Sequence, residues 1–180
     1  RWLPTLLSGR RVLEVACGTG HWTQFIAPVA ESVVAIDSAV ETLRIAEQRV
    51  VASNVVFEVG DAYALPCGKA FTAAFAGFWW SHVPLERQHA FLRGLDASLA
   101  PGARVVLLDN RFVEGSSTAI AERDAVGNTY QVRTLADGST HRVLKNFPAE
   151  AELRALLATG LGESVDYRAW RFYWALVYHV

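Results

Sequence analysis

The chain has 180 residues, of which 52% are apolar and 19% are charged, and its formal net charge at pH 7 is −1. This composition excludes a disordered polar chain and predicts one folded domain over residues 1–180. A balance so close to neutral, without a basic run or an apolar run of membrane-spanning length, argues against nucleic acid and membrane as partners.

The cysteine content points to a reducing compartment. The two cysteines, Cys17 and Cys67, are too few for a disulfide framework, so we expect reduced thiols in a cytoplasmic protein. Residues 1–4 do not resemble a signal peptide, and the sequence contains no methionine. We therefore expect that further residues precede Arg1.

Through the first two thirds of the chain, short apolar runs alternate with helical patterns. This alternation is typical of a parallel sheet that helices cover on both faces. The predicted strands are residues 11–16, 32–37, 54–60, 70–79 and 103–109. The predicted helices are residues 21–29, 40–51 and 85–99. Pro84 lies where the first turn of a helix prefers proline, and Pro101-Gly102 ends that helix.

The last third of the chain has a looser pattern. Residues 112–127 are predicted to be a loop or a short helix. The turn residues 136–139 separate two apolar runs and indicate a hairpin within residues 130–147. A further helix and two final strands are predicted, at residues 149–158, 164–170 and 172–179.

The first strand runs into a glycine turn, Gly18-Thr19-Gly20. Glycine lets the backbone bend sharply and approach a ligand without a clash from a Cβ atom. The helix that follows presents free backbone N–H groups toward such a ligand. Alone the turn is a weak signal, because many α/β domains contain one that binds nothing.

Acidic residues at the next two strand ends add to the glycine turn. Asp37 ends the second strand, where a carboxylate has enough acceptor positions for both hydroxyls of a ribose. Asp61 and Ala62 follow the third strand, where a carboxylate and an N–H group suit an amino-purine edge. Because the carboxyl ends of parallel strands share one crevice, the three together predict an adenosine ligand. The alternative is that both acids only cap helices.

The turn itself distinguishes between nucleotides. A dinucleotide-binding loop has a third glycine, at the position that Thr23 occupies here, and no P-loop lysine is present. Instead, residues 12–20 resemble the first motif of class I S-adenosylmethionine-dependent methyltransferases. Residues that resemble later motifs of that family follow in order, at 33–38, 59–62, 71–80 and 99–103.

The resemblance implies a fold and a cofactor. The fold is a Rossmann-like α/β sheet of seven strands in the order 3-2-1-4-5-7-6, the last antiparallel, with helices on both faces and the extra hairpin near 130–147. The cofactor is S-adenosylmethionine, and its product is S-adenosylhomocysteine. The residues implied to bind it are Glu14, Ala16, Cys17, Gly18, Gly20, Asp37, Ser38, Asp61, Ala62, Gly77 and Phe78.

The acceptor of the methyl group is less well specified. The expected reaction is in-line displacement by an oxygen, nitrogen or carbon atom of a small molecule, in a monomer or homodimer without a metal. His82 follows the fourth strand and is either a general base or a loop histidine bonded to backbone. The residues predicted to line the acceptor pocket are Trp22, Trp79, Trp80 and Arg111.

Two other functions fit parts of the sequence. One is an NAD(P)-dependent oxidoreductase, which shares a glycine turn after the first strand. The other is a protein that binds S-adenosylmethionine without catalysis and serves as a regulatory or partner subunit. The position of Thr23 argues against the first, and only an activity separates the second from an enzyme.

Overall fold

The computed structural model describes residues 2–66, 68 and 70–180. The thiol of Cys67 therefore lies outside the described residues.

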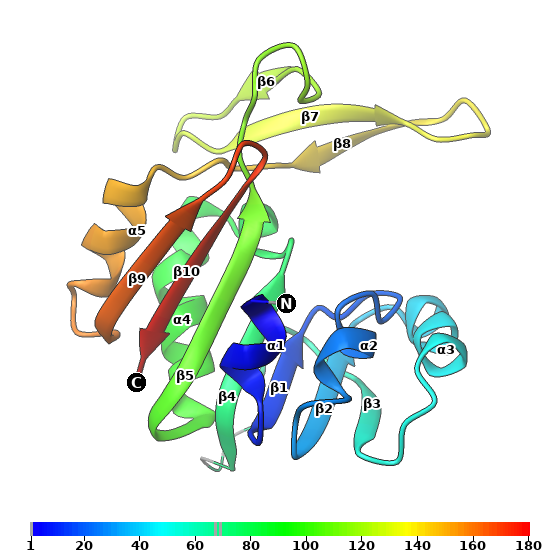
Figure 1. Cartoon of the computed structure of the whole chain (residues 1–180). Coiled ribbons are helices and arrows are strands. Elements are labelled where there is room, and N and C mark those ends of the chain that lie inside the picture. The colour runs from blue at the N-terminus through cyan, green and yellow to red at the C-terminus, as the bar shows by residue number, and fades with distance from the viewer. Residues whose placement is uncertain (1, 67, 69) are drawn as a thin grey trace.

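Seven strands form the central sheet, in the order β3-β2-β1-β4-β5-β10-β9 (Figure 1). Six run in one direction, and β10 is antiparallel to both of its neighbours. The order and the single reversed strand confirm the predicted topology. The strands are β1 (Arg11–Val15), β2 (Ser32–Asp37), β3 (Val55–Val59), β4 (Phe71–Gly77), β5 (Leu99–Asn110), β9 (Glu163–Ala169) and β10 (Tyr173–His179).

Helices cover both faces of this sheet, as predicted. Successive strand residues point to opposite faces, so Val12 and Leu13 of β1 belong to two different apolar clusters. Figure 1 shows one helix in front of the sheet and another behind it. The first cluster packs beneath α1 (Trp2–Leu7), α2 (Thr23–Ile26) and α3 (Val40–Arg49). The second packs beneath α4 (Gln88–Ala97) and α5 (Glu150–Leu157).

Several element boundaries differ from the prediction. Helix α1 lies in a stretch with no predicted element, where Leu3 and Leu7 are buried at the spacing of one helical turn. Helix α2 has only four residues, because the glycine turn extends as far as Trp22. The predicted helix 85–99 starts as a 3-10 turn, η2 (Leu85–Arg87), and Leu99 already pairs with Phe71 of β4.

A second, smaller sheet lies across the carboxyl end of β5 (Figure 1). It contains the predicted hairpin as β7 (Thr129–Thr134) and β8 (Thr140–Leu144), with Gly138 at a φ of +84° in the turn. The third strand, β6 (Glu122–Arg123), pairs with β7 and lies in the stretch predicted to be a loop or a short helix.

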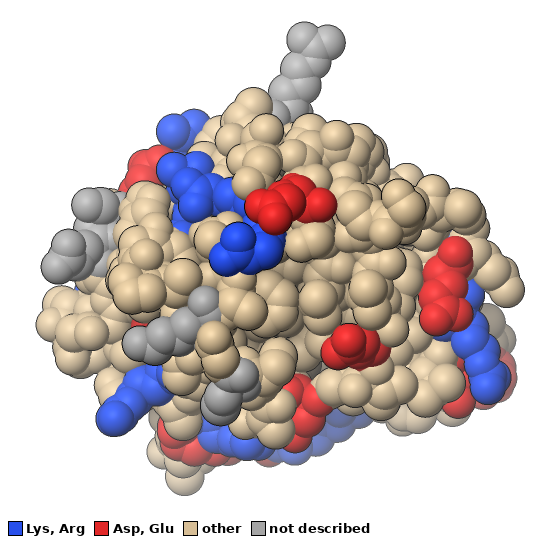
Figure 2. Space-filling view, turned by 90° about the horizontal axis from the view of Figure 1, so that it is seen from below, with Lys and Arg blue, Asp and Glu red and all other residues tan. Residues whose placement is uncertain are grey.

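The opposite end of the molecule is formed by the amino ends of the parallel strands. Figure 2 shows basic and acidic side chains interspersed among uncharged residues on this face. Among the described residues, no helix has the length and apolar character needed to cross a bilayer.

Candidate functional site

The glycine turn leaves β1 in a left-handed backbone conformation. Ala16, Gly18 and Gly20 have φ angles of +53°, +55° and +73°. A Cβ atom on Gly20 would lie 3.1 Å from the Cβ of Ala46 in α3, so the turn packs directly against that helix. Positive φ at the non-glycine Ala16 is strained backbone, which tends to occur where a site is pre-organised. Glycine is therefore required at position 20 for conformation and for space.

Asp37 connects the glycine turn to the second strand. Its Oδ2 accepts the N–H of Gly18 at 2.9 Å, and its Oδ1 accepts the N–H of Ala39 at 2.9 Å and the hydroxyl of Thr42 at 3.3 Å. The carboxylate thus stabilises the first turn of α3, as the capping alternative expected. A carboxylate has about four lone-pair positions. Asp37 is also only half-buried, so it keeps acceptor capacity for a ligand beside the exposed Ser38.

Asp61 and Ala62 lie where the chain leaves β3. The Oδ1 of Asp61 accepts the N–H of Tyr63 at 2.9 Å, and the side chain is exposed. Ala62 is buried at the rim of the cluster beneath α4. The three strand ends with the residues predicted for adenosine thus follow one another across neighbouring strands β1, β2 and β3.

Glu14 is a buried acid near the carboxyl end of β1. It is 1% exposed, and its Oε2 has no hydrogen-bond partner among the described residues. Burial raises the pKa of Glu14 to about 8, and the Thr23 hydroxyl lowers it in part. An unpartnered buried carboxylate is costly unless a cation or donor satisfies it. Glu14 therefore suits a positively charged ligand group.

Cys17 lies in the turn that follows β1, close to Glu14. Burial and the charges of Glu14 and Asp37 raise the pKa of its thiol, so the group stays protonated. It packs with the apolar cluster beneath α1 and α2. The thiol therefore behaves as a small apolar side chain.

The end of β4 has the second strained backbone position, Phe78 with a φ of +61°. The preceding residue has to be glycine, because a Cβ atom on Gly77 would lie 2.8 Å from the Trp22 indole and 2.8 Å from Phe75. The Phe78 ring lies between Trp22 and Tyr173, with centroid distances of 5.9 and 5.8 Å. An aromatic wall therefore begins where the predicted cofactor residues of β4 end.

A cavity of about 530 Å³ opens against this wall. We name it the aromatic cavity, and it includes Trp22, one of the four predicted pocket residues. Phe78, predicted as a cofactor residue, lines it too. Sequence reasoning missed the other lining residues, because α1, α2 and the turn between β9 and β10 meet only in the folded chain. These residues are Trp2, Leu3, Pro4, His21, Phe25, Leu108, Trp170 and Tyr173.

Comparisons with known proteins decide the family. A family model described as a methyltransferase domain matches residues 12–102. A ubiquinone biosynthesis O-methyltransferase of Xanthomonas oryzae pv. oryzae (strain PXO99A) is 32% identical over 176 residues, covering 92% of this chain and 70% of that protein. This chain belongs to the S-adenosylmethionine-dependent methyltransferases.

Solved structures agree with this family. The DhpI–SAH complex has a TM-score of 0.77 and 29% identity, covering 94% of this chain and 76% of that one. A complex titled DhpI-SAM-HEP has a TM-score of 0.76 and 30% identity, covering 93% and 77%. PH0226 protein from Pyrococcus horikoshii OT3 shares the fold, with a TM-score of 0.77 at 18% identity. The methyltransferase therefore uses S-adenosylmethionine, and the NAD(P)-dependent alternative is not supported.

The chemistry of the site fits this cofactor. S-adenosylmethionine has an α-ammonium group, and the unpartnered Oε2 of Glu14 is a buried acceptor for such a cation. The absence of a Cβ atom at Gly18, which has no neighbour within 4 Å of that position, leaves room for close approach to the backbone. Both features lie at the carboxyl end of β1, Glu14 within the strand and Gly18 in the turn that follows it.

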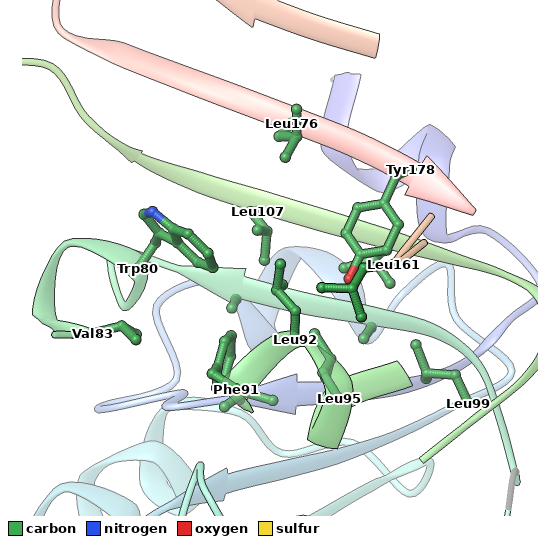
Figure 3. Close-up of a cluster of buried hydrophobic side chains, with 14 of the residues drawn as sticks. Trp80, Val83, Phe91, Leu92, Leu95, Leu99, Leu107, Leu161, Leu176 and Tyr178 are labelled. Carbon is green, nitrogen blue, oxygen red and sulfur yellow. The ribbon is translucent and has the colours of Figure 1, made fainter. Parts of the chain in front are cut away.

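Trp79 and Trp80, two other predicted pocket residues, face the core of the methyltransferase. Trp80 is 1% exposed and points into the cluster of leucines from α4 and β5 (Figure 3). Trp79 packs edge-on against Tyr63 and Phe91. Neither tryptophan lines the aromatic cavity.

The predicted residues Arg111 and His82 lie toward the second sheet. Arg111 donates from its guanidinium to the carbonyl of Trp170 at 2.8 Å. His82 ends the 3-10 turn η1 (Trp80–His82), and burial, followed by the charge of Lys145, lowers the pKa of its imidazole. His82 is therefore neutral at pH 7, as a general base must be, but it does not line the aromatic cavity.

A buried polar network beside His82 joins the second sheet to the central one. Asp109 is fully buried and accepts the backbone N–H and the hydroxyl of Ser81 at 2.8 and 3.0 Å. Lys145 donates to the Ser81 hydroxyl at 2.6 Å and to Asn110 Oδ1 at 3.0 Å, and lies 3.4 Å from Asp109 Oδ1. In the part of the chain that the structure describes, no group of three His, Cys, Asp or Glu side chains is arranged to hold a metal ion.

Proposed function

We propose that this methyltransferase transfers its methyl group to an oxygen atom of a small molecule held in the aromatic cavity. The observation that carries the proposal is the position of this cavity, which begins at Phe78, the strained residue at the end of β4. The apolar lining suits an acceptor with an apolar or aromatic body. The names of the related Xanthomonas proteins, which are O-methyltransferases, favour oxygen over nitrogen and carbon.

The cofactor-binding residues are assigned on chemical grounds. Glu14 pairs with the ammonium group, and the backbone of Gly18 and Gly20 contacts the methionine part. Asp37 accepts the ribose hydroxyls, and Asp61 accepts from the adenine edge. The remaining residues contribute backbone or apolar contacts around the cofactor, namely Ala16, Cys17, Ser38, Ala62, Gly77 and Phe78.

Bound S-adenosylmethionine supplies an electrophilic methyl group. The chain contributes mainly alignment, because in-line displacement needs the acceptor atom held close and on axis. Trp22, Phe78 and Tyr173 form an aromatic wall at this end of the cavity. The assignment of His82 as the base that takes the acceptor's proton stays a prediction, which its neutral imidazole supports and its position outside the lining of the aromatic cavity does not.

Methyl transfer to catechol and to aniline tests the proposal. The two acceptors are similar in size, and the NMR spectrum of the product shows which atom is methylated. We expect S-adenosylhomocysteine and a methylated catechol, with little transfer to aniline. Transfer to aniline alone would contradict an oxygen acceptor. Transfer to neither, with the cofactor bound, would contradict acceptor binding in the aromatic cavity.

A pair of truncations locates the acceptor. Phe25 is 47% exposed and lines the cavity, so its truncation leaves the core intact. Phe25→Ala is expected to raise the KM for catechol roughly fivefold, as the loss of about 1 kcal/mol of apolar contact implies. Leu135→Ala is the control, since Leu135 is similarly exposed but lies at the hairpin of the second sheet. Equal effects of the two variants would place the acceptor elsewhere.

A further inference from the structure

A second cavity, of about 410 Å³, lies where the small sheet meets the carboxyl end of β5. We name it the basic cavity. Three cations from separate segments line it, Arg111 after β5, Arg133 on β7 and Lys145 after β8. No Asp or Glu is among its described lining residues. The hydroxyl groups at its edge belong to Ser116, Ser117 and Thr118.

The charges around the basic cavity do not balance. Asp109 is the acid that lies beside Lys145, and it already accepts from Ser81 and from the N–H of Asn110. Arg111 and Arg133 form no ion pair in the described part of the chain. Arg111 is instead fixed by the carbonyl of Trp170. At least one positive charge at this cavity is therefore unpaired.

The neighbouring strand β8 carries a cation whose charge is paired within the protein, and it serves as a comparison for Arg133. Arg142 on β8 donates twice to Glu122, at 2.8 and 2.9 Å, and lies 3.4 Å above the ring of Tyr130. In the hairpin register Arg142 is opposite Val132, whereas Arg133 is one residue further along β7 and points to the other face. Arg133 shares that face with Gln131, which also lines the basic cavity.

The basic cavity adjoins the aromatic cavity. Tyr173 lines both, and its ring lies 5.8 Å from that of Phe78. Tyr173 is therefore a wall that the two cavities share, and the cations of the basic cavity lie beyond it as seen from Phe78. The hydroxyl of Ser117 accepts the N–H of Val113, so its own proton is free to donate toward a ligand oxygen.

We propose that the basic cavity binds a carboxylate or phosphoryl group of the methyl acceptor, so that the substrates are small anions with a free hydroxyl. Arg111 and Arg133, which form no ion pair in the described part of the chain, supply charge, and the hydroxyl groups of Ser117 and Thr118 supply further donors. Charge-assisted hydrogen bonds of this kind hold and orient a ligand more strongly than neutral ones. The inference rests on the proposed oxygen acceptor only for its second part, the assignment of the bound anion to the acceptor.

Ion binding tests the site without turnover. Inorganic phosphate and, separately, acetate are titrated by calorimetry into the chain loaded with S-adenosylhomocysteine, with sodium chloride holding ionic strength constant. We expect one ion per chain, and the ion that binds more tightly identifies the group as phosphoryl or carboxylate. Arg133→Gln should weaken it roughly fivefold or more, whereas Arg142→Gln should change it less than about twofold. No binding of either ion, or equal weakening in both variants, would overturn the anion site.

Acceptor kinetics test the second part. We expect Arg133→Gln to raise the KM for 4-hydroxybenzoate about tenfold and to leave the KM for phenol unchanged. An equal change for both acceptors would overturn the assignment of the anion to the substrate. Methylation of neither acceptor, with the cofactor bound, would instead contradict the proposed function, and the ion titration would still decide the anion site.

Discussion

At the proposed cofactor site, three successive strands of one sheet end beside one another, and each carries a backbone turn or a carboxylate from within residues 14–62. The proposed acceptor site, the aromatic cavity, collects its residues from the whole chain, as the edge-on contact between Trp2 and Trp170 shows. The first region is a short, local motif. The second depends on which distant segments meet in the folded chain.

Removal of the Asp37 carboxylate should have the largest effect. Asp37→Ala loses the acceptor of the Gly18 N–H as well as the proposed ribose contacts. We expect S-adenosylhomocysteine affinity to fall roughly 100-fold, as the loss of two charge-assisted hydrogen bonds implies. Calorimetry measures it, with Glu41→Ala as the control, because that exposed acid in the first turn of α3 changes the charge equally. A folded Asp37→Ala protein with nearly unchanged affinity would show that Asp37 is only a helix cap.

The sequence predicted the strands that carry the proposed cofactor residues and the order of these strands in the sheet, and the physical reason is local. Buried parallel strands are continuous apolar runs, and the residues that follow them mark the crevice without knowledge of distant contacts. The sequence could not predict α1 as part of the site. Its six residues are too few for a clear period, and its role depends on Trp170, more than 160 residues away.

Glu14 should couple cofactor binding to pH. In the unliganded protein its pKa is about 8, so it is mostly protonated at pH 7. Pairing with an ammonium group favours the ionised form, so binding should release a proton and affinity should rise with pH up to about 8. Calorimetry in buffers of different ionisation enthalpy measures that proton. Glu14→Gln should release none, and an unchanged proton release in this variant would rule out Glu14 as the partner.

The raised pKa of Glu14 also predicts how the stability of the unliganded protein depends on pH. The folded pKa of Glu14 lies above the unfolded value, so its contribution to stability is full below about pH 4.5 and is lost as pH rises through about 8. Glu14→Gln should therefore be more stable than the natural chain at pH 9, with the difference shrinking toward pH 5. Thermal unfolding without cofactor checks this. A constant difference across that range would contradict the burial of an ionisable acid.

Tryptophans lie both in the core and in the wall of the aromatic cavity, and sequence pattern alone does not distinguish the two positions. Trp80→Phe should lower the free energy of unfolding by about 1–3 kcal/mol, since a smaller ring leaves a void among Leu107 and the α4 leucines. It should leave the acceptor KM unchanged. Trp22→Phe should raise the acceptor KM and leave the free energy of unfolding nearly unchanged, because Trp22 lines the aromatic cavity and is only half-buried. A raised acceptor KM in Trp80→Phe at unchanged stability would show that Trp80 contacts the acceptor. The acceptor would then bind on the Trp80 side of β4 and not beside Tyr173.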